Sequence, residues 1–79
     1  MTESEWTAKW ENGLGEVSYQ PRRPNGEVLW ENDILGSLWS KTPPHGFFPD
    51  LYLRQEVAEK KARREHENHA RRTWRRVTW

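Results

Sequence analysis

Tryptophan is the residue type that most constrains how this chain can fold. Six of its 79 residues are Trp, while hydrophobic residues of all kinds make up only 33%. A chain of this length forms one small domain with a marginal core. Because one aromatic ring system buries on the order of 150–250 Å², aromatic side chains can replace missing aliphatic ones. We predict a compact aromatic head built from Trp6, Trp10, Trp30, Trp39 and Phe47.

The chain has no cysteine, which excludes both disulfides and thiolate zinc sites. Its first residues are acidic and are followed by no apolar run, so we expect neither a signal peptide nor a transit peptide. No stretch approaches the roughly 20 apolar residues that cross a membrane. The sequence therefore predicts a chain that is not secreted, located in the cytoplasm or in a virion.

Charge is distributed unevenly, although the net charge is only +1. Residues 1–35 contain seven acidic and three basic side chains, whereas residues 36–79 contain ten basic and five acidic ones. The basic half could meet an anionic partner or the acidic half of a second copy. Two differently charged, solvated faces are the simpler interpretation, and composition alone does not separate them.

The first thirty residues predict one short helix followed by a hairpin. Trp6, Trp10 and Leu14 are spaced four apart, as on one helical face, which predicts a helix over residues 4–12. Polar and apolar residues then alternate in residues 16–19 and again in residues 27–30. An Asn-Gly pair between these segments is a strong turn signal. We expect a small β-hairpin with a loose loop.

A second short helix is expected over residues 33–39, because Asn32 is a good N-cap and the apolar residues that follow fall on one side. Those residues are Ile34, Leu35, Leu38 and Trp39. Paired prolines then exclude helix, so residues 40–46 should form a loop.

A long helix is predicted from Leu51 towards Arg76, capped by Asp50 and uninterrupted by proline or glycine. The expected fold class is small α+β, mainly helical. Residues 1–49 form the head and residues 50–79 the projecting helix of the same single domain.

Apolar residues nearly vanish from this helix after Val57, leaving small or adaptable side chains at steps of four. A helix buried in its own domain would show a wider stripe of larger residues. We predict that this line meets a protein partner or a second copy; the alternative is a solvated helix with incidental alanines. The predicted interface residues are Ala62, His66, Ala70, Trp74, Val77 and Trp79.

The end of the chain also combines arginines with tryptophans, a pairing that suits phosphate backbones and unpaired bases. Arginine and tryptophan are equally typical of protein interface hot spots, and cations are favoured at any helix C-terminus. Nucleic-acid binding is therefore an alternative function. Its candidate residues are Arg71, Arg72, Arg75, Arg76, Arg22 and Arg23.

Metal and catalytic chemistry have little support. His66 and His69 are three residues apart, but a third ligand could come only from His45 or Asp50, without diagnostic spacing. No cysteine nucleophile, Gly-x-Ser-x-Gly elbow or phosphate-binding glycine loop occurs. We predict no metal, no cofactor, no small-molecule substrate and no enzymatic activity.

Two strings in the chain resemble each other: residues 10–15 read Trp-Glu-Asn-Gly-Leu-Gly and residues 30–36 read Trp-Glu-Asn-Asp-Ile-Leu-Gly. We attribute this to chance in a Trp-rich and Glu-rich chain, since two short copies do not make a repeat protein. The function favoured by the sequence is a non-catalytic accessory subunit of a larger assembly, of phage or bacterial type, docking through its C-terminal helix. An inhibitor of a nucleic-acid enzyme, acting through the acidic half, is a third hypothesis.

Overall fold

The computed structural model describes residues 4–72, and their side chains as far as Asn68. Five β-strands and one helix follow one another along the chain, with the helix last. The expectation of a mainly helical fold is wrong, because strands hold more residues than the helix does. Within the described part of the chain, no helix is long and apolar enough to cross a membrane.

The first sheet is a hairpin of β1 (Thr7–Glu11) and β2 (Val17–Pro21), paired antiparallel so that Lys9 lies opposite Tyr19. The helix predicted over residues 4–12 is therefore wrong. Apolar residues spaced by four fit a strand as well as a helix, because four residues are also two full strand repeats. Gly15, at a φ of +80°, completes the turn between the two strands.

The second sheet has the order β4–β3–β5 and contains β3 (Val28–Asn32), β4 (Gly36–Ser40) and β5 (Phe48–Pro49). Trp30 lies opposite Leu38 on one side and Pro49 on the other. The helix predicted over residues 33–39 is thus also wrong. Gly36 has a φ of +82°, which no right-handed helix accommodates, and it begins a strand instead.

The connection between the two hairpins contains the predicted Asn-Gly turn, with Gly26 at a φ of +98° and its N–H donating to the Arg23 carbonyl at 2.9 Å. The segments beside it do not form the expected hairpin with each other. Their backbones meet at an isolated bridge between Arg22 and Val28, beside which the Arg23 N–H donates to the Glu27 carbonyl at 2.8 Å, while β2 pairs with β1 and β3 with β4. The turn was predicted correctly, but the pairing of residues 16–19 with 27–30 was not.

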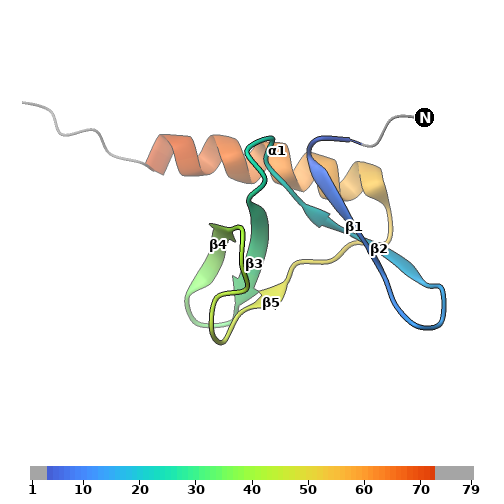
Figure 1. Ribbon diagram of the computed structural model, residues 1–79. Helices are drawn as coiled ribbons and strands as arrows, with labels where there is room; N and C mark the ends of the chain where they lie inside the picture. The colour runs from blue at the N-terminus through green and yellow to red at the C-terminus, as the bar shows by residue number, and fades with distance from the viewer. Residues whose placement is uncertain (1–3, 73–79) are drawn as a thin grey trace, which may run out of the picture.

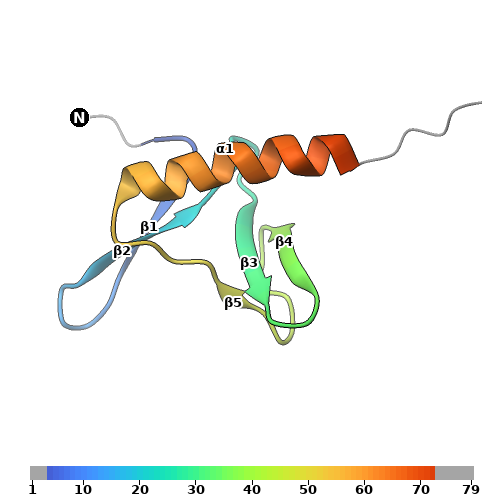
Figure 2. The same cartoon turned by 180° about the vertical axis from the view of Figure 1, so that it is seen from behind.

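Helix α1 (Gln55–Arg72) lies across one end of both hairpins, whose turns point away from it (Figures 1 and 2). It begins four residues later than predicted, because Tyr52 forms an antiparallel bridge to Tyr19 with N–O distances of 2.7 and 2.8 Å. Ala58 and Ala62 are fully buried. Ala62 packs with Leu29 and Trp39 in the core, so small side chains let the helix approach the sheets closely.

Candidate interaction surface

Large apolar side chains lie on the surface of the second hairpin, where few neighbours cover them. In the turn between β3 and β4, Ile34 is 91% exposed and Leu35 is 73% exposed. Leu38 on β4 and Phe48 on the neighbouring strand β5 are also exposed, but on opposite faces of the sheet, because Leu38 lies opposite Trp30 and Phe48 lies opposite Glu31. Scattered exposed apolar residues are normal, but two adjacent ones at a single turn, such as Ile34 and Leu35, make a candidate interaction site. We call residues 32–36 the hairpin tip.

Side-chain hydrogen bonds hold the hairpin tip in shape. The Asn32 Oδ1 atom accepts from the backbone N–H groups of Ile34 and Leu35, both at 2.8 Å. The Asn32 Nδ2 atom donates to the Gly46 carbonyl at 2.9 Å, which ties the tip to the following loop. Asparagine commonly organises turns in this way. The two apolar side chains are therefore presented by an ordered backbone.

The turn of the first hairpin is built in a similar way, although its glycine stands three residues after the asparagine and that of the second hairpin four. Asn12 Oδ1 accepts from the N–H groups of Leu14 and Glu16 at 2.9 and 3.0 Å, and Gly15 closes the turn with positive φ as Gly36 does. Leu14 is 86% exposed. The two similar strings in the sequence thus adopt similar local structures, although the first turn presents one large apolar residue and the second presents two.

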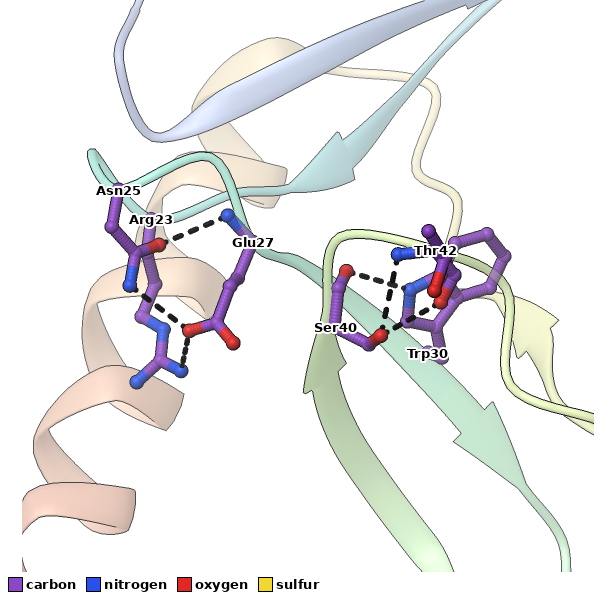
Figure 3. Close-up of polar contacts among 6 residues, drawn as sticks. All are labelled: Arg23, Asn25, Glu27, Trp30, Ser40 and Thr42. Carbon is purple, nitrogen blue, oxygen red and sulfur yellow. Dashed lines mark hydrogen bonds and ion pairs between the residues drawn. The ribbon is translucent and has the colours of Figure 1, made fainter.

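The two hairpins also place their first tryptophans alike. Trp10 Nε1 donates to Gln20 Oε1 at 2.8 Å, and Trp30 Nε1 donates to the Ser40 carbonyl at 3.0 Å, ten residues ahead in both cases. Figure 3 shows Trp30 beside Ser40 and Thr42. Only Trp30 is buried, at 4% exposure, whereas Trp10 is 43% exposed. The second hairpin is therefore built around its tryptophan and the first is not.

The residues predicted as a helical interface are placed differently from one another. Ala62 faces the core of its own chain, so it is not available to a partner. The ring of His66 makes an edge contact with Trp6, with centroids 5.4 Å apart, and is exposed. Ala70 lies in the last turns of α1, and its side chain is outside the described part. Trp74, Val77 and Trp79 lie outside the described residues.

Arg22 and Arg23, two of the arginines predicted to bind nucleic acid, contact other residues of the same chain. Arg22 Nη1 donates to the Glu5 carbonyl at 2.8 Å. Arg23 is paired with Glu27, which also accepts from Asn25 (Figure 3), and its guanidinium lies 4.6 Å from the centre of the Trp39 ring. The Arg23 side chain is only 12% exposed.

The side chains of the other four arginines predicted to bind nucleic acid lie outside the described part of the structure. Arg71 and Arg72 belong to the end of α1, with side chains outside the described part, and Arg75 and Arg76 lie outside the described residues.

Two ionisable side chains in the segment that links β5 to α1 have raised pKa values. Burial raises the pKa of the Asp50 carboxyl above 3.8, and nearby Glu31 adds to the effect. Burial also raises the pKa of Tyr52 to about 12, so its hydroxyl stays protonated. Among the described residues, no three His, Cys, Asp or Glu side chains are grouped to hold a metal ion.

An open, mostly polar hollow of about 540 Å³ lies where α1 begins. Ser4 and Glu59 both line it, and Ser4 Oγ donates to Glu59 Oε1 at 2.5 Å. It contains no part of the hairpin tip. No protein-family model, curated protein or solved structure matches this chain.

The hairpin tip was not among the interaction sites predicted from the sequence. The spacing of Ile34 and Leu35 predicts that they lie on one side of a helix, together with Leu38 and Trp39. The signal that could have located them is the combination of Asn32 with Gly36, since asparagine favours turns and glycine permits positive φ. The same combination occurs in Asn12 and Gly15.

Proposed function

We propose that this chain is a non-catalytic protein-interaction module that docks through the tip of its second hairpin. The observation that carries the proposal is the exposure of Ile34 and Leu35 on an ordered turn. Binding gains most when apolar anchors are covered and little conformational entropy is lost. Ile34 and Leu35 supply exposed apolar anchors, and the hydrogen bonds to Asn32 already fix the backbone of the turn, so little entropy is lost on binding. The role of accessory subunit inferred from the sequence is kept, with a different docking surface.

The helical surface expected from the sequence contributes less to this proposal. Ala58 and Ala62 are fully buried within the chain, so neither side chain can contact a partner. The C-terminal cluster around Trp74 and Trp79 stays a prediction. Nucleic-acid binding gains no support from Arg22 and Arg23, because both guanidinium groups already have partners within the chain. Protein binding is therefore the function that we propose.

The proposal is tested with a paired variant and a matched control. The chain is immobilised, a binding protein is recovered from an extract of the source cells, and its affinity is remeasured with both proteins purified. Ile34→Ser together with Leu35→Ser should weaken binding at least tenfold, since burying one such side chain contributes about 1.5–3 kcal/mol. Leu14→Ser removes an equally exposed leucine from the equivalent turn and should leave the affinity unchanged.

Folding of both variants is checked by far-UV circular dichroism. The proposal fails if the double variant binds the purified protein as tightly as the unmodified chain does. It also fails if Leu14→Ser weakens binding as much, because the two turns would then be interchangeable.

A further inference from the structure

Strand β4 is an edge strand with none of the usual protection against pairing. It lies at the end of the order β4–β3–β5, and in both views no other described element runs along its outer side (Figures 1 and 2). Its sequence, Gly-Ser-Leu-Trp-Ser, contains no charge and no proline. Edge strands of natural proteins normally carry such residues to block pairing with another strand. The outer backbone groups of β4 are therefore open to a further strand.

We propose that β4 pairs antiparallel with β4 of a second copy, forming a symmetric dimer with one continuous sheet. The inference rests on the proposed function and names a partner for the same hairpin. With the two-fold axis at Leu38, Gly36 of one copy lies opposite Ser40 of the other, and Ser37 lies opposite Trp39. All five residues of the strand find partners, and the sheet order becomes β5–β3–β4–β4–β3–β5.

The side chains agree with this arrangement. Leu38 is 42% exposed on the sheet face that it shares with Trp30 and Pro49. In the dimer the two Leu38 side chains become cross-strand neighbours, with Cβ atoms about 4.5–5.5 Å apart. Each would cover apolar surface that the other leaves open.

Charge favours a second copy over a charged peptide. The strand itself offers no countercharge to an acidic or a basic segment. At its ends the pairing places Lys41 of each copy beside the hairpin tip of the other, and that tip carries Asp33. The chain as a whole has a net charge of only +1, so two copies repel each other little.

One strand pair is a small interface, below the ~1,200 Å² of standard complexes, so the dimer should be weak and depend on concentration. Sedimentation velocity over a concentration series of the full chain measures it. Leu38→Lys places two positive charges directly opposite each other, and Leu38→Glu two negative ones. Each variant alone should dissociate at least tenfold more readily than the unmodified chain. An equimolar mixture of the two should recover the dimer, because unlike charges then face each other.

Leu14→Lys is the matched control, with the same new charge on the other hairpin, and it should dimerise normally. The proposal is overturned if the unmodified chain stays monomeric throughout the series. It is equally overturned if Leu38→Lys dimerises normally or if the mixture does not recover. None of these results bears on the Ile34 and Leu35 variant binding test, so the two proposals can fail separately.

Discussion

The two hairpins share a turn design but differ in how they are supported. In β1–β2, the first tryptophan is 43% exposed and the strands pack against α1, while in β3–β4 the equivalent tryptophan is 4% exposed. The second hairpin presents its apolar turn at the end away from the helix (Figure 1). One local sequence pattern therefore sets the turn, and the surrounding contacts decide whether the hairpin serves the core or the surface.

The comparison also shows how a small chain can expose apolar residues and stay folded. Trp30 and Trp39 are buried on opposite faces of the second sheet. Trp30 lies opposite Leu38 and shares its face, whereas Trp39 is the next residue after Leu38 on the strand and therefore points to the other face. The hairpin is thus stabilised at its base. Its tip can then carry Ile34 and Leu35 without being needed for stability.

The largest predicted difference lies in the two tryptophans. Trp30→Ala should lower the free energy of unfolding by about 3–5 kcal/mol, as a large buried aromatic ring is lost. Trp10→Ala should cost about 1–2 kcal/mol, mainly because buried Gln20 loses its hydrogen-bond donor. Urea unfolding followed by circular dichroism measures both. Equal losses would mean that the two hairpins support the fold equally.

A smaller effect is predicted at the glycines that close the turns. Gly15→Ala and Gly36→Ala should each cost about 1–2 kcal/mol, because both residues have positive φ. An added Cβ would meet nothing within 4 Å at either position, so only backbone strain contributes. The measurement is again the free energy of unfolding. The costs should match, since the turns are built alike.

Gly13→Ala is the control for this pair. Gly13 is not among the glycines with positive φ, and a Cβ there meets nothing within 4 Å. Its replacement should be neutral or slightly stabilising, because alanine has less conformational freedom in the unfolded chain. A tolerated Gly36→Ala beside a costly Gly15→Ala would refute the equivalence of the turns.

The sequence allowed the interior of α1 and the Asn-Gly turn to be predicted, because both follow from local signals. Of the aromatic residues predicted from composition to build the head, Trp30 and Trp39 are buried, whereas Trp10 is 43% exposed. The sequence did not predict strands at residues 7–11 and 36–40, since apolar residues four apart fit two periodicities and only the tertiary pairing decides between them. The contact of Arg23 with Trp39 joins residues distant in sequence, so no spacing could reveal it. The hairpin tip was not predicted because its apolar residues were read, like those of β4, as part of a helix over residues 33–39.

The smallest predicted effect is the pH dependence of stability that Asp50 and Glu27 contribute. Asp50 has a folded-state pKa raised mainly by burial, so its contribution to stability is present below pH 3.8 and is lost as pH rises through the raised pKa. Glu27 has its pKa lowered, chiefly by the hydrogen bond from Asn25, so its contribution is present above pH 4.5 and is lost on acidification. The two groups act in opposite directions.

Asp50→Asn should therefore raise the free energy of unfolding relative to the unmodified chain at pH 7, and the gain should shrink as pH falls towards 4. Glu27→Gln should lower it at pH 7, with the loss shrinking below pH 4.5. Urea unfolding at a series of pH values measures both differences. A gain for Asp50→Asn that stays constant with pH would show that burial does not disfavour the Asp50 carboxylate. The second sheet would then tolerate that charge as readily as an exposed surface does.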